Sequence, residues 1–137
     1  MQFINFTKNN TATTLAFDDY ADEKLCECKI NISDAEWIIS SWYTSDGHKH
    51  NGYGKQTMKA CLSYIRARFK LPDRIKYVWN GANGYVLDWL KDNFDAICDC
   101  PIAVQKNAFD DDWSSHIYTL NKDKFMKYFE IDKMSED

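Results

Sequence analysis

Two glycines stand in the segment whose residue types are best suited to chemistry. Gly52 and Gly54 follow a run of apolar residues and precede a segment with helical periodicity. At such a strand-to-helix turn, free backbone N–H groups and the positive end of the helix dipole favour an anion. Glycines let the backbone approach a phosphate closely and adopt positive φ angles. Lys49 and Lys55 flank the turn, so we expect this loop to bind a pyrophosphate.

Two common phosphate-binding motifs do not fit this loop. A Walker loop ends in Gly-Lys-Ser/Thr, whereas Gly54 and Lys55 are followed by Gln56, and the required earlier glycine is missing. A dinucleotide fingerprint needs a third glycine, which this chain lacks in the stretch up to Met58, and an acidic residue at the end of the next strand, which Tyr77–Asn80 lacks. The remaining alternative is a turn that serves packing alone, and such a turn has no need of flanking lysines.

The elements that position the loop can be predicted from periodicity. Ala35–Thr44 is apolar or small on both faces and rich in β-forming residues, which is typical of a central strand covered on both sides. After the loop, an amphipathic helix is expected to end before Pro72, because its apolar residues recur with helical spacing. Those residues are Met58, Cys61, Leu62, Ile65 and Phe69.

The remaining strands and helices complete a single α/β domain over residues 1–137. The expected strands are Gln2–Phe6, Thr13–Phe17, Lys24–Ile32, Ile75–Asn80, Ala96–Gln105 and Ser115–Leu120. A second helix is expected after Asn83. A last helix is expected from Lys122, with Asn121 as its N-cap and with Phe125, Met126 and Phe129 facing inward. This order predicts an antiparallel start, one parallel strand–helix–strand crossover and two closing strands. With 45% hydrophobic and 15% aromatic residues, 137 residues suffice for one core.

The glycine turn and its surroundings resemble the GNAT superfamily of N-acetyltransferases. The family signature Gln/Arg-x-x-Gly-x-Gly/Ala is matched by Lys49–Gly54, with Lys in place of Gln or Arg. The next family motif begins at an Asn that opens a helix and closes on Gly-Phe. Asn83–Phe94 resembles it, one residue short and with Asn93 in place of the glycine. The resemblance covers roughly Ala35–Leu120 and implies a GNAT-like mixed, mostly antiparallel sheet with a central parallel β-α-β crossover and flanking helices.

The resemblance also implies a binding site for acetyl-CoA. The main chain of Trp42, Tyr43 and Thr44 would hydrogen-bond the pantetheine arm, and Asn80 and Asn83 would lie near the thioester. Backbone N–H groups of the loop would hold the pyrophosphate. The loop residues are Lys49, His50, Asn51, Gly52, Tyr53, Gly54 and Lys55. The expected chemistry is direct attack of an amine acceptor, a small molecule or a protein, on the thioester carbonyl.

The sequence departs from the family at the catalytic groups. The family often uses a Tyr late in the second helix as the acid that protonates the leaving thiolate, and Trp89 or Leu90 stands there in this chain. Tyr85, one turn earlier, is the nearest substitute; the alternative is a Tyr that only packs. His48, or else His50, titrates in the range that suits a base, and a solvated loop histidine is the alternative.

Acidic residues offer weaker candidates. The end of the Ala35–Thr44 strand has no carboxylate, and Glu36 lies at its far end. Asp110–Asp112 falls in a loop that lies near the acceptor site in GNAT-like folds, where it could attract a cationic amine or simply be solvated. Thr7–Glu23 is too short and too polar for the two helices that the family carries after its first strand. We therefore expect an open acceptor site or a partner that completes it.

Composition excludes several classes of function. With 21 acidic and 17 basic residues the net charge is −4, so we expect no nucleic-acid partner. No segment approaches the roughly 20 apolar residues that span a bilayer, and Met1–Phe17 lacks the pattern of a signal peptide. Five cysteines, an odd number, are expected to be reduced thiols in the cytoplasm. The two Cys-x-Cys pairs are spaced too closely for most structural zinc sites, so core thiols are expected and no metal.

These observations predict an acetyl-CoA-dependent N-acetyltransferase. The missing Tyr and the missing strand carboxylate leave a second hypothesis, a non-catalytic GNAT-like module that binds CoA or a protein. A plain interaction protein is the third. A homodimer is kept as a candidate assembly.

Overall fold

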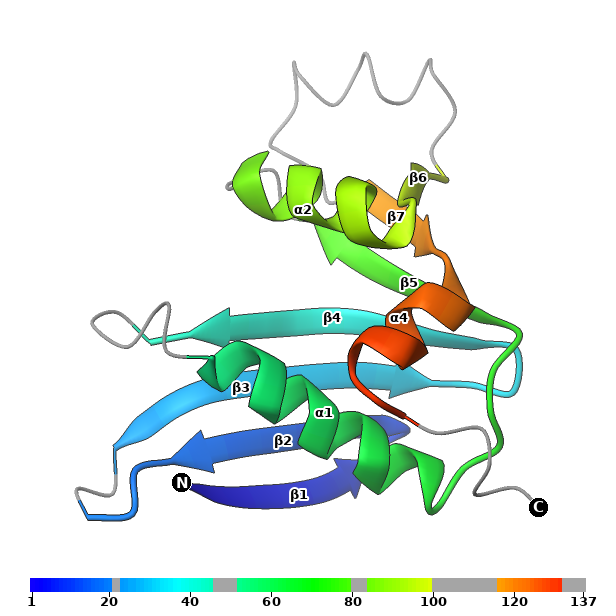
Figure 1. Ribbon diagram of the computed structural model, residues 1–137. Helices are drawn as coiled ribbons and strands as arrows, with labels where there is room; N and C mark the ends of the chain where they lie inside the picture. Colours follow the sequence, from blue (N-terminus) through cyan, green and yellow to red (C-terminus); the bar gives the residue numbers. More distant parts are fainter. Residues whose placement is uncertain (21–22, 46–51, 80–83, 100–115, 132–137) are drawn as a thin grey trace.

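One mixed sheet organises the chain. The computed structural model describes residues 1–20, 23–45, 52–79, 84–99 and 116–131. Its strands are β1 (Gln2–Lys8), β2 (Thr11–Phe17), β3 (Lys24–Ile32), β4 (Glu36–Thr44), β5 (Arg74–Trp79), β6 (Ile97–Cys98) and β7 (His116–Leu120). They form a seven-stranded sheet in the order β1-β2-β3-β4-β5-β7-β6 (Figure 1). Among the described ladders, β4–β5 is parallel and the others are antiparallel, which confirms the predicted topology.

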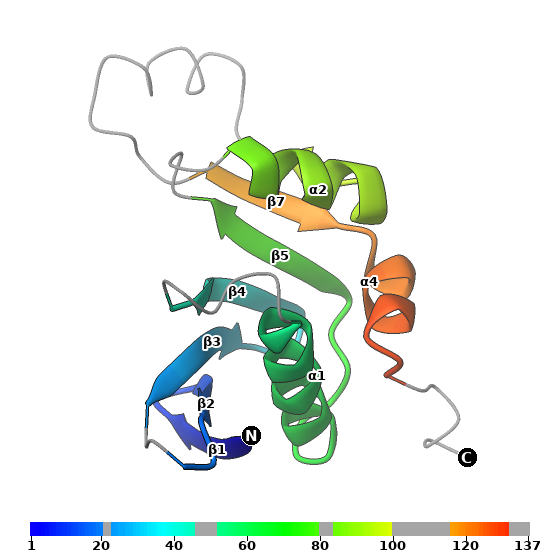
Figure 2. The ribbon, with the colours of Figure 1, turned by 60° about the vertical axis from the view of Figure 1, so that its left-hand side comes forward.

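The described helices lie on one face of this sheet (Figures 1 and 2). They are α1 (Tyr53–Arg66), α2 (Gly84–Phe94) and α4 (Lys122–Tyr128). Their buried residues form one cluster with the inner residues of the sheet, including Ile30, Trp37 and Ile39. On the opposite face, which we call the open face, Tyr43 is 44% exposed. The prediction that β4 is covered on both sides is therefore wrong.

A β-bulge in β4 changes which residues face the helices. Ile30 pairs with Ile39, but Lys29 pairs with Ser41, so Ser40 is the extra residue. Trp37 and Ile39 are fully buried on the helix face before the bulge. After it, even-numbered residues take over that face, and Trp42 packs on aromatic residues of α2 and α4.

The strands β1 and β2 form an N-terminal hairpin, where the resemblance to the GNAT superfamily would imply two helices. Asn9 and Asn10 have φ angles of 52° and 62°, as a two-residue type I′ turn requires. The described part of Thr7–Glu23 accordingly contains strand and turn and no helix, as predicted.

Helix α1 is shorter than the sequence indicated. Its predicted inner residues Met58, Cys61, Leu62 and Ile65 are at most 1% exposed, but the helix ends at Arg66 and Phe69 lies beyond it. Phe69 still packs on the core and its N–H bonds the Ile65 carbonyl. The chain thus leaves the helix before Pro72, as predicted.

The C-terminal helix α4 is as predicted. The Asn121 side chain caps it by accepting a hydrogen bond from the Lys124 N–H at 3.0 Å. Phe125 and Phe129 are fully buried.

The strand predicted over 96–105 is observed only as Ile97–Cys98, and residues 100–115 lie outside the described residues.

Three of the cysteine residues contribute to the core. Cys26, Cys28 and Cys61 are free, buried thiols, which confirms the prediction for the first Cys-x-Cys pair. Burial raises the pKa of Cys28 well above its usual value and that of Cys61 to about 11, so both thiols stay protonated. Among the described residues no group of three or more metal-ligating side chains is present, and none of the described helices has the length and hydropathy to span a membrane.

An ion-pair network holds the start of β4 to β5 and to the end of β6. Lys76 Nζ lies 3.0 Å from a Glu36 carboxylate oxygen and 2.7 Å from one of Asp99, and Arg74 adds a bond of 2.9 Å to Glu36. Hydrogen bonds from Lys76 and Arg74 hold the pKa of Glu36 below its usual value. Burial pulls the pKa of Asp99 upward, but bonds from Lys76 and Thr119 outweigh it and lower that pKa. Glu36 thus forms ion pairs at the start of β4, at the opposite end of that strand from the glycine turn.

Replacing Lys76 by Met is expected to lower the free energy of unfolding at pH 7 by about 1 kcal/mol, because partly exposed ion pairs contribute modestly. Carboxylates with lowered pKa values stabilise the fold above their ordinary values of 4.5 and 3.8, and this contribution is lost as pH falls through the lowered values. Urea unfolding at pH 7 and pH 3 measures it. The difference between variant and wild type should shrink at pH 3, and Lys29→Met on the same open face should show less effect at either pH.

Candidate functional site

The parallel strands β4 and β5 part at the centre of the sheet. Their ladder runs from Glu36 with Arg74 to Ile39 with Tyr77. β4 then continues to Thr44, and the described strands offer no ladder partner to Ser40–Thr44 on the side of β5. Backbone N–H and C=O groups seek partners when they are covered. This edge of β4 is therefore a place where an extended ligand can form main-chain hydrogen bonds.

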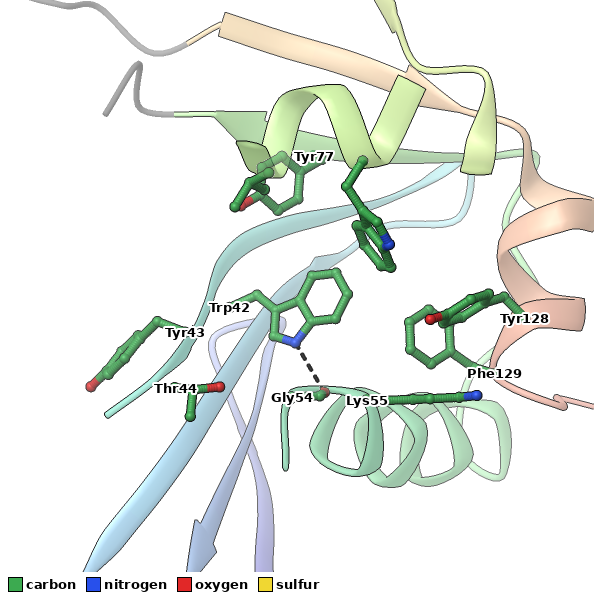
Figure 3. A pocket seen from close by; sticks show the side chains of 10 residues that line it. Trp42, Tyr43, Thr44, Gly54, Lys55, Tyr77, Tyr128 and Phe129 are labelled. Atoms are coloured by element: carbon green, nitrogen blue, oxygen red, sulfur yellow. Dashed lines mark hydrogen bonds between the residues drawn. The ribbon is translucent and has the colours of Figure 1, made fainter. Parts of the chain in front are cut away.

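The first turn of α1 is packed against the end of β4. Trp42 donates a hydrogen bond of 3.1 Å from Nε1 to the Gly54 carbonyl oxygen (Figure 3). A Cβ atom at Gly54 would lie 3.4 Å from Thr44 Oγ1 and 3.6 Å from Trp42 Nε1. A side chain longer than a methyl group would have to extend out of this contact.

The N-terminus of α1 is uncapped. Gly52 is the N-cap residue and has a φ angle of 78°. Because glycine has no side chain, no side-chain hydrogen bond caps the helix, and the first turn of the helix contains no acidic residue. The positive φ explains the glycine, because other residues rarely adopt it. The first N–H groups of a helix lack partners within the helix and carry partial positive charge. Lys55 adds a full charge in the same turn, so this end of α1 favours an anion.

A cavity of about 360 Å³ connects the edge of β4 with the N-terminus of α1 (Figure 3). Its walls come from β4, α1, β5, α2 and the C-terminal end of α4. The lining residues are Trp42, Tyr43, Thr44, Gly54, Lys55, Tyr77, Val86, Trp89, Tyr128 and Phe129. Aromatic rings therefore dominate the surface that a ligand would contact.

Ring contacts fix the walls of this cavity. The Trp42 ring centroid lies 5.8 Å from that of Trp89 and 5.7 Å from that of Phe129, both edge to face. Lys55 extends along α1 until Nζ lies 4.6 Å above the Tyr128 ring (Figure 3). Cation–π contacts of this kind are weak at exposed sites, so Lys55 can exchange Tyr128 for a phosphate.

Tyr77 stands where β4 and β5 part. It is the last β5 residue in the parallel ladder, and its side chain lines the cavity. Burial, with a smaller contribution from Cys28, raises the pKa of Tyr77 above its usual value. Its phenol therefore keeps its proton over a wide pH range and can serve as a hydrogen-bond donor.

The structure brings together five of the residues that the sequence analysis assigned to the cofactor. Trp42, Tyr43, Thr44, Gly54 and Lys55 all line the cavity. The other assigned residues either adjoin it or lie outside the described residues. Gly52 and Tyr53 begin α1, with Tyr53 packed on the Ala16, Leu25 and Cys26 cluster, whereas Lys49, His50, Asn51, Asn80 and Asn83 are outside the described residues.

The predicted catalytic residues are not brought into the cavity by the described structure. Tyr85 is 87% exposed in the first turn of α2 and is not among the lining residues. His48 lies outside the described residues. Trp89 lines the cavity and Leu90 is fully buried, so neither position supplies an acid.

Sequence reasoning did not assign five of the lining residues to the site, namely Tyr77, Val86, Trp89, Tyr128 and Phe129. Tyr77 was assigned only to a strand, although its place near the end of that strand was a usable signal. Tyr128 and Phe129 follow the segment that resembles the GNAT motifs, and Phe129 was expected only to face the core. Nothing local in the sequence shows that α4 returns to the glycine turn.

Comparison with known proteins identifies the fold. No protein-family model matches the sequence, and no curated protein matches it. Among solved structures, the PaiA N-acetyltransferase from Thermoplasma acidophilum in complex with coenzyme A is 14% identical, with a TM-score of 0.57 over 81% of this chain and 60% of that one. A GNAT family acetyltransferase from Elizabethkingia anophelis with acetyl-CoA bound is 13% identical, with a TM-score of 0.55 over 81% and 76%.

Nourseothricin acetyltransferase gives the same result, at 14% identity and a TM-score of 0.58 over 81% of this chain and 64% of that one. The chain thus spans between 60% and 76% of the length of these three structures. It has the fold of the GNAT N-acetyltransferases, as its glycine turn indicated. At these identities the likeness defines the fold, and function has to be argued from the site.

Proposed function

We propose that this protein is an acyl-CoA-dependent N-acyltransferase that transfers the acetyl group of acetyl-CoA directly to an amine acceptor. One observation carries the proposal. The strand edge Ser40–Thr44 lacks a described partner on the side of β5, and an aromatic cavity joins it to the uncapped N-terminus of α1. A ligand with an anionic group at one end and an amide-containing arm at the other matches both features.

The residues of the chain divide the binding between them. The first N–H groups of α1 and Lys55 suit the pyrophosphate, because both supply positive charge at the mouth of the cavity. The main chain of Trp42, Tyr43 and Thr44 would pair with the amides of the pantetheine arm as an additional strand would. The cavity volume of about 360 Å³ matches the pantetheine arm rather than a whole CoA molecule. The parts of CoA that are not assigned to residues here would therefore extend beyond the cavity.

The proposed reaction needs a proton donor beside the sulfur. Acetyl-CoA supplies an activated acyl group: a C–N bond forms to the amine, the C–S bond breaks, and the electron pair leaves on sulfur. We assign the donor of the proton to Tyr77, because its phenol is protonated and lies where β4 and β5 part. The acceptor amine gives up a proton to a base, for which His48 remains our prediction, and Tyr85 remains the alternative acid.

A non-catalytic CoA-binding module is the second candidate function. It is favoured by the described lining of the cavity, which includes neither a carboxylate nor a histidine. In both cases we expect the protein to work in the cytoplasm, where its thiols stay reduced.

The two functions are separated by one experiment in two steps. Calorimetric titration with acetyl-CoA should show binding in the micromolar range. CoA release is then followed with a thiol reagent in the presence of spermidine, an aminoglycoside and a lysine-containing peptide. Release that depends on one of these amines supports the enzyme, whereas tight binding without release supports the module. Absence of binding would eliminate both.

A further inference from the structure

The edge strand β1 has few of the features that usually prevent edge-to-edge pairing. It is seven residues long, contains no proline, and carries one charge, Lys8. Its ladder with β2 is regular from Gln2 with Phe17 to Lys8 with Thr11. Bulges, prolines and repeated charges are the common protections of an edge. The other edge of the sheet, β6, has only two residues.

The hairpin geometry determines which groups of β1 point outward. In a two-residue hairpin, the residues that flank the turn form a hydrogen-bonded pair, and here these are Lys8 and Thr11. Because such pairs alternate along the strands, the even-numbered residues of β1 direct their N–H and C=O groups to β2. Phe3, Asn5 and Thr7 direct theirs away from the sheet. No strand of the described sheet pairs with these outward groups, so they are open to another strand or to water.

Two apolar side chains accompany this edge on the open face. Ile4 is 51% exposed and Phe6 is 43% exposed. The odd-numbered residues point to the helix face instead, where Asn5 bonds Thr14 and Thr7 bonds the Tyr64 hydroxyl at 2.8 Å. Ile4 and Phe6 therefore form a short apolar strip directly beside the unpaired edge.

We propose that β1 pairs antiparallel with β1 of a second copy of this chain, about a twofold axis through Asn5. In this register Asn5 faces Asn5 of the copy and Phe3 faces Thr7, so all outward groups meet a partner. Ile4 then faces Phe6 in the non-hydrogen-bonded positions, where side chains of opposite strands are closest. Lys8 faces Gln2, so no like charges meet. An interface of this kind uses the same residues on both copies.

The match between the residues of two β1 strands in one register favours a second copy over an unrelated strand. Hydrogen-bonding registers centred on Phe3 or Thr7 pair fewer residues, because the axis then lies near one end of the strand. Only the register centred on Asn5 joins both apolar side chains of one copy to both of the other. A twofold pairing is closed by its symmetry, because the β1 edge of each copy is then covered by the other.

Sedimentation velocity of the full chain tests this interface. The wild type should form a dimer at about 10 μM and above, as expected for a small interface. Thr7→Pro removes an outward N–H without touching the ladder to β2, and proline is tolerated at such a position. It should be a monomer over the same range. Thr7→Ala loses the same hydroxyl but keeps the N–H, so it should remain a dimer, as should Ile97→Lys at the opposite edge.

Cross-linking tests the register. Ile4→Cys protein mixed with Phe6→Cys protein should form a disulfide-linked dimer faster than either variant alone. A wild type that stays monomeric at about 100 μM would overturn the proposal and leave the edge to a strand of another protein. A dimer that survives Thr7→Pro, or one without the mixed cross-link, would also overturn it. The far-UV circular dichroism spectrum and the thermal unfolding transition of each variant show whether it is folded, and these readouts depend neither on the dimer nor on acetyl-CoA binding.

Discussion

Gly54→Glu protein is expected to bind acetyl-CoA about 100-fold more weakly than the wild type, a loss of about 3 kcal/mol. A Cβ atom at this position already lies 3.4 Å from Thr44 Oγ1 and 3.6 Å from Trp42 Nε1. The rest of the side chain must therefore extend into the cavity. Its carboxylate would stand beside the N-terminus of α1, where the proposed pyrophosphate binds, and would repel that group in a partly desolvated site. Calorimetric titration measures the loss directly.

Two matched variants separate this effect from others. Gly54→Ala adds a methyl group at ordinary contact distance and should change the affinity by less than about 5-fold, because it neither fills the cavity nor adds charge. Gln56→Glu adds the same charge in the same turn, at an exposed residue that does not line the cavity. If Gln56→Glu weakened binding as much as Gly54→Glu, net charge alone would explain the loss. Unchanged affinity in Gly54→Glu would place the ligand elsewhere.

The crossover at the centre of the fold could be predicted because several local signals agree. Four apolar residues of α1 at helical spacing are all buried, and Gly52 has the positive φ that its residue type suggested. The Asn121 cap and the start of α4 follow from equally local chemistry. Such features depend on residues a few positions apart, which is the range over which a sequence can be interpreted directly.

The bulge at Ser40 could not be predicted. Up to Ile39, odd-numbered residues face the helices, and beyond Ser41 the even-numbered ones do. Because this strand has small and apolar residues on both faces, its sequence does not show where the inward-facing residues change from odd to even numbers. The same composition suggested that the strand was covered on both sides. In the structure, the described helices cover one face of the sheet, and the open face of β4 retains exposed surface at Tyr43.

The position at which α4 packs in the fold could not be predicted from the sequence either. Tyr128 and Phe129 reach the cavity through the packing of α4 on α2 and α1, including the contact between Tyr128 and Lys55. The contact between Tyr128 and Lys55 joins residues more than 70 positions apart in the sequence. The aromatic pattern of α4 predicted burial, and burial alone does not identify the residues that it is buried against.

Tyr77→Phe protein is expected to lose about 100-fold in kcat with little change in KM, since general acid catalysis contributes about this much. The phenol lines the cavity where β4 and β5 part, and burial raises its pKa. Because the acid form is the active one, wild-type kcat should hold as pH rises and fall only as pH passes the raised pKa. Tyr77→Phe should lack this fall. Steady-state rates across pH, with the best amine acceptor, provide the measurement.

Tyr128→Phe is the matched control for Tyr77→Phe. It removes a hydroxyl from the same cavity and keeps the ring over which Lys55 lies, so kcat should remain within about 3-fold of the wild type if the position of the donor is what matters. A readout without an acceptor is the thiol pKa of bound CoA, followed by thiolate absorbance. A donor beside the sulfur stabilises the thiolate, so this pKa should be lower in the wild type than in Tyr77→Phe. Equal values in the two proteins would show that Tyr77 does not touch the sulfur, even if CoA binds as proposed.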